Sequence, residues 1–317
     1  MQRVTDRLPS RTGLTVLEVL VAIGIVGLIA ALVTPAVQQV RASSRRVRCS
    51  NNLRQVGQAM SSIAESDGRF PTSQQPKSAH LRLLPYLDGK NLYDAITTGV
   101  SPSSWIVPAL ACPDDEVVAE RMRQVGDANY YLNLGTQFSR RSPEYNGFCK
   151  SHAHDTGVRE ITDGASQTVA FSERLVRPTD AIRFTKEQLE AQPRRFFWWT
   201  ETRYYARNEA LAVDNCLNHR TTPIPQSAGV NMGNYQAAHG YNHLLAPNAP
   251  SCYNGPEDMG ADFQLMLVSA SSNHRGGVNA LMVDGSCHFV NNSILPEVWA
   301  ALGTRAGQDL VGNGAWW

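Results

Sequence analysis

Residues 14–33 form an unbroken run in which Glu18 is the only charged side chain. Because an α-helix rises about 1.5 Å per residue, a helix of this length matches the hydrocarbon core of a bilayer, which is roughly 30 Å thick. A secretory signal peptide would have a shorter apolar region with a small-residue cleavage site behind it, and no obvious site of that kind follows Val33. The run therefore predicts one membrane-spanning helix.

Glu18 needs a compensating partner, since a carboxylate inside a spanning helix costs on the order of 3 kcal/mol. A short polar leader precedes the apolar run and ends at Gly13. Cleavage after Gly13 would give Leu14 a new amine, one helical turn from Glu18. In an assembly of such helices, the carboxylate of one chain could pair with the amine of its neighbour, and the low dielectric would strengthen that attraction.

The segment from Gly13 to Ile23 reads G-L-T-V-L-E-V-L-V-A-I, and it resembles the cleavage and methylation signature of type IV prepilins and type II secretion pseudopilins. The resemblance implies that a membrane prepilin peptidase cuts after Gly13 and methylates the new amine of Leu14. It also implies that Glu18 acts in subunit assembly. Pro35 matches the position at which pilin helices often kink, whereas Leu14 departs from the commoner Phe. The alternative is an uncleaved signal anchor in which Glu18 is incidental.

The charge of the chain is balanced, with 29 Lys and Arg against 28 Asp and Glu, and this favours no nucleic-acid partner. Four arginines closely follow the span and, counted alone, would place the C-terminal part in the cytoplasm. The processing signature and the cysteines favour the opposite orientation. The cysteines are widely spaced without a C-x-x-C motif, which fits an exported domain with a few bridges.

Helical periodicity continues beyond the span. Apolar residues recur at spacings of four and three and predict a seam on which a globular head packs; these residues are Cys49, Leu53, Val56, Met60 and Ile63. The sequence Ser-Asp-Gly at 66–68 then predicts the end of the helix. We therefore expect a leader peptide at 1–13, a helix with a spanning and an amphipathic half at 14–66, and a globular head at 67–317.

The head is rich in turn signals, because Asp-Gly pairs and prolines are scattered along residues 67–317. The clearest prediction is a β-hairpin in which residues 278–283 and 286–290 are joined by Asp284-Gly285. Strands at 168–171 and 196–199 and a helix at 294–302 are also expected, and residues 176–261 are predicted to be a loop-rich insertion. The expected fold class is α+β, with the long N-terminal helix packed on a mainly antiparallel β-sheet.

These landmarks resemble a family of bacterial pilin-like proteins of unknown function that is named for a C-terminal H-x9-D-G motif. Here the motif consists of His274, nine further residues and Asp284-Gly285. Matching segments run through almost the whole chain, at residues 49–55, 112–115, 161–168, 247–252 and 302–305. Taken together these matches are specific, although each alone is short.

The cysteines acquire expected roles from this resemblance. It implies a disulfide between Cys49 and Cys112, since both fall in segments that match the family pattern. Cys287 replaces an ordinarily apolar residue and is expected to be either a free core thiol or part of a local extra bridge. The remaining disulfide candidates are Cys149, Cys216 and Cys252.

Enzyme signatures are not found: the sequence contains no Walker A, H-E-x-x-H, G-x-S-x-G or G-x-G-x-x-G motif, and we expect no catalytic residues. His152, His154 and Asp155 are the densest group of potential zinc or copper ligands, but we favour a polar surface loop there. His274 and Asp284 could form an acid–base or ligand pair. We favour the structural alternative, in which His274 caps the start of the hairpin and Asp284 shapes its turn.

No cofactor or metal is expected, with calcium as an alternative, because pseudopilin heads that resemble this one can hold Ca²⁺ near the C-terminal strands. Calcium requires six to eight oxygen ligands. No spacing in the sequence dictates such a cage. The candidate ligands are Asp114, Asp115, Glu257, Asp258 and Asp262.

The sequence thus predicts a pilin-like or pseudopilin-like structural subunit of a type IV pilus or type II secretion-type filament. Its expected partners are a prepilin peptidase, other pilin or pseudopilin subunits and the bacterial inner membrane. It would cross that membrane once, with its head outside the cytoplasm, and would also occur in periplasmic or extracellular filaments. The alternative is a membrane-tethered extracytoplasmic module that binds a solute or a glycan.

Overall fold

The computed structural model describes residues 16–72, 77–100, 106–118, 120, 122, 127–137, 145–151, 153–178, 183–200, 209–224, 240–253 and 266–308. Gly13 and Leu14, at the expected cleavage point, lie outside these residues. So do His152 of the possible metal-ligand group and three of the calcium candidates, Glu257, Asp258 and Asp262.

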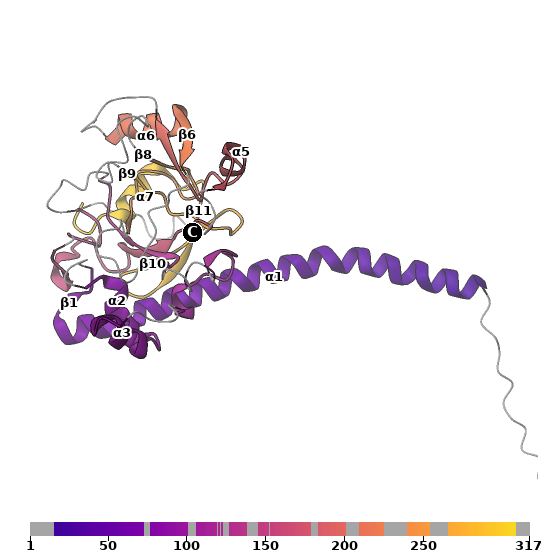
Figure 1. Cartoon of the computed structure of the whole chain (residues 1–317), viewed down its shortest axis with the longest axis horizontal. Helices are drawn as coiled ribbons and strands as arrows, with labels where there is room; N and C mark the ends of the chain where they lie inside the picture. Colours follow the sequence, from indigo (N-terminus) through magenta and orange to yellow (C-terminus); the bar gives the residue numbers. More distant parts are fainter. Residues whose placement is uncertain are drawn as a thin grey trace, which may run out of the picture. The chain divides into compact units, whose positions relative to one another are not determined.

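Helix α1 (Val16–Asp67) contributes to both compact units of the chain, which are Met1–Ser44 and Arg45–Trp317 (Figure 1). The helix ends one residue beyond the predicted position. The second unit begins at Arg45 and includes the C-terminal part of α1, whose buried residues belong to the core of the head.

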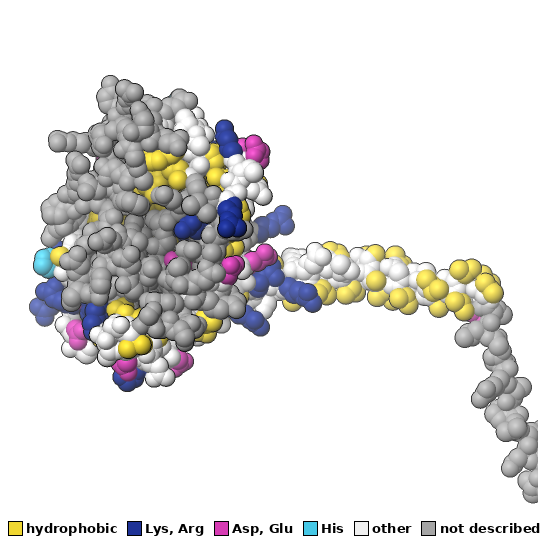
Figure 2. All heavy atoms as spheres, viewed as in Figure 1, with side chains coloured by type: hydrophobic (Ala, Val, Ile, Leu, Met, Phe, Trp, Pro, Cys, Tyr) yellow, Lys and Arg dark blue, Asp and Glu magenta, His cyan; other side chains and the backbone are white. Residues whose placement is uncertain are grey.

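The first unit contains the apolar part of α1. Side chains from residue 16 to residue 48 are exposed, and hydrophobic ones are frequent along this part of the helix (Figure 2). Among the described residues, α1 is the helix that is long and apolar enough to cross a membrane by length and composition, a test that signal sequences also pass. Pro35 lies inside the helix. One residue earlier, the hydroxyl of Thr34 donates a 2.7 Å hydrogen bond to the carbonyl of Ala30.

The C-terminal part of α1 packs on the head through the predicted seam, which is buried in full: Cys49, Leu53, Val56, Met60 and Ile63. Gly57 lies beside this seam, and a Cβ atom there would come within 3.0 Å of Leu281 Cδ1 and 3.3 Å of Gly285 Cα. The glycine therefore lets the helix approach the C-terminal hairpin closely. Gly68, with φ of 68°, ends the helix, and its N–H donates to the carbonyl of Ala64.

A five-stranded sheet forms the centre of the described head, with the order β11-β10-β4-β2-β7. Its strands are β2 (Tyr130–Asn133), β4 (Val169–Glu173), β7 (Gly240–Tyr241), β10 (Gly277–Met282) and β11 (Cys287–Asn291). All pairs are antiparallel except β2 with β7. The predicted hairpin is confirmed as β10–β11, and Gly285 supplies the positive φ that its turn needs.

A second sheet lies partly within residues 176–261, the segment that was predicted to be loop-rich. Its order is β6-β5-β8-β9, formed by β5 (Phe197–Thr200), β6 (Arg220–Ile224), β8 (Ser251–Tyr253) and β9 (Met266–Leu267). The expected strand at 196–199 is β5, and it is buried. The segment looked irregular because β5 pairs in parallel with β8, more than fifty residues away along the chain.

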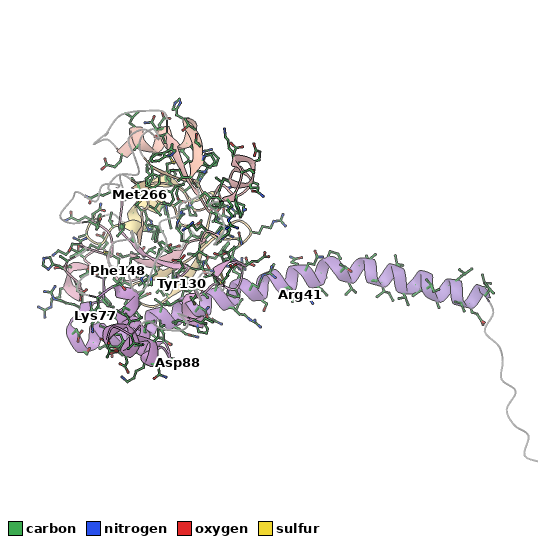
Figure 3. The ribbon with its side chains drawn as sticks, viewed as in Figure 1. Arg41, Lys77, Asp88, Tyr130, Phe148 and Met266 are labelled. Carbon is green, nitrogen blue, oxygen red and sulfur yellow. A yellow bond between two sulfur atoms is a disulfide. The ribbon has the colours of Figure 1, made fainter. Side chains whose placement is uncertain are left out.

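Shorter elements make up the rest of the described part of the head. β1 (Arg69–Phe70) pairs with β3 (Thr156–Gly157). The helices are α2 (Ala79–Leu83), α3 (Lys90–Thr97), α5 (Lys186–Glu190), α6 (Glu209–Asn218) and α7 (Pro296–Gly303), and the 3-10 turns are η1 (Leu84–Tyr86), η2 (Pro108–Leu110) and η3 (Val158–Glu160). Helix α7 confirms the helix expected at 294–302. Tyr130 and Phe148 are both buried in the main core (Figure 3).

Candidate functional site

A disulfide joins helix α1 to the loop that follows η2: Cys49 is bonded to Cys112, with 4.9 Å between their Cα atoms. This is the pairing implied by the resemblance. The Tyr130 hydroxyl donates a 3.2 Å hydrogen bond to the Cys49 carbonyl, so strand β2 holds the same point of the helix. The bridge closes a sequence separation of 63 residues. In the chain-entropy model, closing such a loop stabilises the fold by about 4 kcal/mol.

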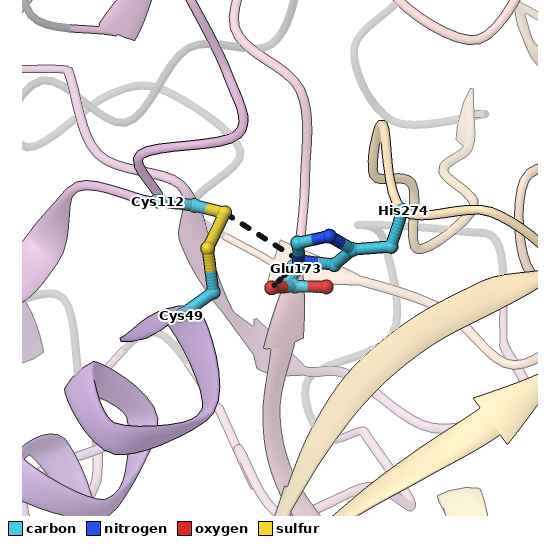
Figure 4. A group of neighbouring side chains, drawn as sticks. All are labelled: Cys49, Cys112, Glu173 and His274. Atoms are coloured by element: carbon cyan, nitrogen blue, oxygen red, sulfur yellow. Dashed lines mark hydrogen bonds and ion pairs between the residues drawn. A yellow bond between two sulfur atoms is a disulfide. The ribbon is translucent and has the colours of Figure 1, made fainter. Parts of the chain in front are cut away.

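His274 lies directly against this disulfide, with 3.7 Å between its Nε2 atom and Cys112 Sγ (Figure 4). The imidazole is buried between two carboxylates. Nδ1 is 2.8 Å from Asp114 Oδ2 and Nε2 is 3.1 Å from Glu173 Oε1. Burial alone would lower the pKa of His274, but the hydrogen bond to Glu173 and the charges of Glu173 and Asp114 outweigh it and raise that pKa. The arrangement therefore favours an imidazolium that donates from both ring nitrogens.

Glu173, at the end of β4, is fixed from the neighbouring strand. Its Oε2 atom accepts from the backbone N–H of Asn279 at 2.8 Å, and Oε1 accepts from Asn279 Nδ2 at 2.9 Å. Strand β10 thus sets the orientation of a carboxylate that lies in a buried strand. The outcome is a hydrogen-bonded carboxylate directed at His274 and the disulfide (Figure 4).

The consecutive aspartates 114 and 115 face different partners. The Asp114 carboxylate contacts Arg45 of α1 as well as His274. Asp115 forms a buried 2.8 Å ion pair with Arg195 and accepts hydrogen bonds from Asn129 Nδ2 and the N–H of Val176. Their oxygens are therefore occupied by cations and N–H donors on separate elements and do not converge on a shared calcium cage.

The H-x9-D-G motif spans strand β10, with His274 before the strand and Asp284-Gly285 after it. Asp284 Oδ1 accepts from the N–H and the hydroxyl of Ser286, so Asp284 shapes the hairpin turn as predicted. His274 is directed at Asp114 and Glu173 instead of capping the hairpin. Glu173 was not predicted from the sequence, although a carboxylate in an otherwise apolar strand is a signal of a buried polar pair.

A second disulfide joins Cys216 and Cys252. The prediction that Cys149 is a disulfide candidate is wrong: it is a free, buried thiol, 3.3 Å from the carbonyl oxygen of Thr72. Burial raises the pKa of Cys149 to about 12, so the thiolate is scarce at neutral pH. Cys287 is also free and partly buried, which matches one of its two expected roles.

The remaining predicted residues are distributed outside this cluster. Glu18 lies in the first turn of α1 and is exposed. His154 is exposed, and Asp155 is engaged by a 2.5 Å ion pair with Arg82 and by the N–H of Thr72. Within the described part of this His-Asp group, Asp155 is thus bonded to neighbouring elements of the head, whereas His154 faces solvent.

A cavity of about 570 Å³ lies beside the disulfide. It is bounded on one side by α1 residues and on the other by the segment around Cys112, and most of the surface that faces it is apolar. The lining residues are Arg48, Asn51, Asn52, Ile106, Pro108, Ala111, Pro113, Asp115, Glu116, Val118 and Met122. Asn52 connects the two sides by donating hydrogen bonds to the carbonyls of Pro108 and Ala111. Its volume is within the range of ordinary small-molecule sites.

The fold and the cluster define a class of protein in which a long helix, apolar in its N-terminal part, is disulfide-bonded to an α+β head around a buried His–carboxylate group. The chain belongs to a bacterial family described as "Protein of unknown function (DUF1559)", whose model matches residues 38–297. The match includes both disulfides and the residues around His274. No curated protein and no solved structure matches the chain.

Proposed function

We propose that this protein is a pilin-like or pseudopilin-like structural subunit, cut after Gly13 and assembled through the apolar part of α1. The observation that supports this proposal most is the exposure of that helix. Large hydrophobic side chains such as Val16, Leu20 and Ile29 are more than half exposed in the isolated chain. An apolar surface of this extent is covered by lipid or by other protein chains. In the proposal, the helix is first surrounded by lipid and then, after assembly, by the helices of other subunits.

The anchoring of α1 within the second unit fits a subunit that transmits force. The helix is held there by a buried seam, by the Cys49–Cys112 bridge and by the Arg45–Asp114 ion pair. A helix that served only as a temporary targeting signal would need no covalent bond to the folded domain. In the proposed filament, this bond couples each head to the helical core.

Glu18 has a defined role in this proposal. It lies in the first turn of α1, and after cleavage its carboxylate would neutralise the new amine of Leu14 on an adjacent subunit. The subunit's partners are then the prepilin peptidase, the inner membrane and further pilin-like chains. The role is structural, and the proposal assigns no catalytic step to the head.

Co-purification with filaments tests the proposal. Filaments sheared from cells that express the wild type are expected to contain the protein, whereas Glu18→Ala should leave it membrane-inserted, with a folded, oxidised head, and absent from the sheared fraction. Gln58→Ala, an exposed change on the same helix, serves as the matched control and should assemble normally. A wild-type protein that stays in the membrane fraction under conditions in which filaments form would contradict the proposal.

The cavity beside the disulfide favours a second candidate, a membrane-tethered module that binds a solute or glycan. Its volume and apolar lining suit a small ligand with an apolar face. Thermal-shift screening of the full chain against glycans and apolar solutes would test it. A hit should be lost in Ala111→Trp, which fills the cavity, and retained in Tyr86→Trp, which changes an exposed residue elsewhere.

A further inference from the structure

We propose that the reduced protein binds one zinc ion through Cys49, Cys112, Glu173 and His274, at the position that the disulfide occupies in the oxidised protein. Each of the four side chains offers one ligand atom, and these atoms all lie within 4.8 Å of one another. All four residues are buried. They come from four separate parts of the second unit: α1, the loop after η2, β4 and the segment before β10 (Figure 4).

The set of donor atoms suits zinc. Structural zinc sites are tetrahedral and use thiolate sulfur at about 2.3 Å, imidazole nitrogen at about 2.0 Å and carboxylate oxygen at about 2.1 Å. Two sulfurs, one nitrogen and one oxygen supply four ligands of these types. The two sulfurs are bonded to each other in the oxidised protein, so they must be released before they can serve as separate ligands.

The orientation of His274 supports a metal site more specifically than the cluster alone. Its Nδ1 atom is held by Asp114 at 2.8 Å, so that Nε2 faces the other two kinds of ligand, Glu173 Oε1 at 3.1 Å and Cys112 Sγ at 3.7 Å. A carboxylate on the far nitrogen is the usual outer partner of a zinc-bound histidine, because it fixes the ring and raises its basicity. Arg45 contacts the same Asp114 carboxylate and balances its charge.

Glu173 is supported in the same manner. The backbone N–H and the side-chain amide of Asn279 hold its two oxygens at 2.8 and 2.9 Å. Both non-sulfur ligands are thus preorganised by outer hydrogen bonds, and reduction of one bond is the change that completes the site. This arrangement differs from an exposed acidic cluster, in which the carboxylates would be free to rotate.

The disulfide is converted to the metal site in two steps, reduction and then metal binding. A dithiol reductant transfers two electrons and two protons to the Cys49–Cys112 bond, giving two thiols and the oxidised, cyclic disulfide of the reductant. Zinc then displaces one proton from each thiol and one from Nε2 of the imidazolium, so that binding releases three protons. Affinity should therefore increase with pH. The helix α1 remains joined to the loop after η2 in both states, through a disulfide or through the metal.

Cobalt(II) titration of the full chain tests this proposal. After treatment with a dithiol and removal of excess reductant without air, the wild type should bind one Co²⁺ per chain, with sulfur-to-cobalt charge transfer and the visible bands of a tetrahedral ion, and Zn²⁺ should displace it. The oxidised protein should show neither signal. Asp114→Asn should weaken binding by roughly 10–100-fold, as expected for an outer partner of a metal-bound histidine.

The double variant Cys49→Ser with Cys112→Ser is the matched control, because it keeps the other four cysteines. It should lose the cobalt spectrum while its far-ultraviolet circular dichroism remains that of the reduced wild type. His274→Gln should lose the tetrahedral bands likewise. A reduced, folded wild type that binds no cobalt, or a double variant that retains the same spectrum, would overturn the proposal.

Discussion

His274 Nε2 and Glu173 Oε1 lie 3.1 Å apart, and the two side chains are only 1% and 2% exposed. Buried ionisable groups of opposite charge persist when both are well hydrogen-bonded, because an unpaired charge in that environment is strongly destabilising. Here Asp114 and Asn279 provide the additional hydrogen bonds. The pair connects β4 to the start of β10 beside the helix–head disulfide, and it therefore has measurable consequences for stability.

The first prediction concerns the alkaline side of the stability curve. Because the folded-state pKa of His274 is raised, its contribution is fully present below the unfolded pKa near 6.5 and is lost as the pH rises through the higher folded value. The unfolding free energy of the wild type, measured in urea, should exceed that of His274→Gln most below about pH 6. The gap should narrow toward pH 9.

His219→Gln provides the control for this prediction, because the His219 side chain is about half exposed. Its unfolding free energy should follow that of the wild type across the same pH range. A gap between the wild type and His274→Gln that stays constant or widens with increasing pH would show that His274 is not held as an imidazolium.

A second prediction concerns stability at acid pH, which His80 and His243 are expected to lower. Burial lowers the pKa of His80 to about 4 and that of His243 to about 3. Below about pH 6.5 the unfolded chain binds protons that the folded chain does not, so each histidine should reduce stability by up to about 1.4 kcal/mol per pH unit. In His80→Gln, the number of protons bound by the unfolded chain should exceed the number bound by the folded chain by close to one fewer than in the wild type. An unfolding free energy that depends on pH as steeply in His80→Gln as in the wild type between pH 6 and pH 5 would contradict this.

The third prediction concerns the disulfides. Peptides from the unreduced, denatured and alkylated protein should contain the pairs Cys49–Cys112 and Cys216–Cys252, with Cys149 and Cys287 alkylated. Replacing the first pair with alanines should lower the unfolding free energy by about 4 kcal/mol. Cys149→Ser leaves both bridges intact and is the control. A linked peptide that contains Cys149 would refute the assignment.

A fourth prediction tests the close approach of α1 to the C-terminal hairpin. Gly57→Ala would place its Cβ atom 3.0 Å from Leu281 Cδ1, and overpacking of this kind costs about 1–3 kcal/mol, partly offset by the better helix propensity of alanine. Gly27→Ala is the matched control, since a Cβ there meets nothing within 4 Å. The first change alone should lower the thermal unfolding temperature of the head. An equal decrease in both variants would contradict the close contact between α1 and the C-terminal hairpin.

The sequence predicts the parts of this fold that are local. The apolar seam of α1 follows from helical spacing, and the β10–β11 hairpin follows from Asp284-Gly285 between two β-prone segments. The second sheet was missed because Phe197 of β5 pairs with Ser251 of β8. This is a parallel contact between distant segments, and no turn motif in the sequence predicts it.

The candidate site was predicted only in part, for a related reason. Cys49, Cys112 and His274 were each identified from motifs, but the sequence pairs His274 with Asp284 by proximity along the chain. In the structure its partners are Asp114 and Glu173, which come from a loop and a strand 160 and 101 residues earlier in the sequence. The pairing of β4 with β10 brings Glu173 to His274. Asp114 lies in the loop that the Cys49–Cys112 bridge fixes to α1.

The mature N-terminus tests the proposed function most directly. Intact-mass and N-terminal peptide analysis of the protein purified from its native membrane should find a chain that begins at Leu14 and carries one added methyl group on its amine. A chain that begins at any other residue, or that retains residues 1–13 in cells with an active prepilin peptidase, would contradict the proposal that this protein is a processed pilin-like subunit.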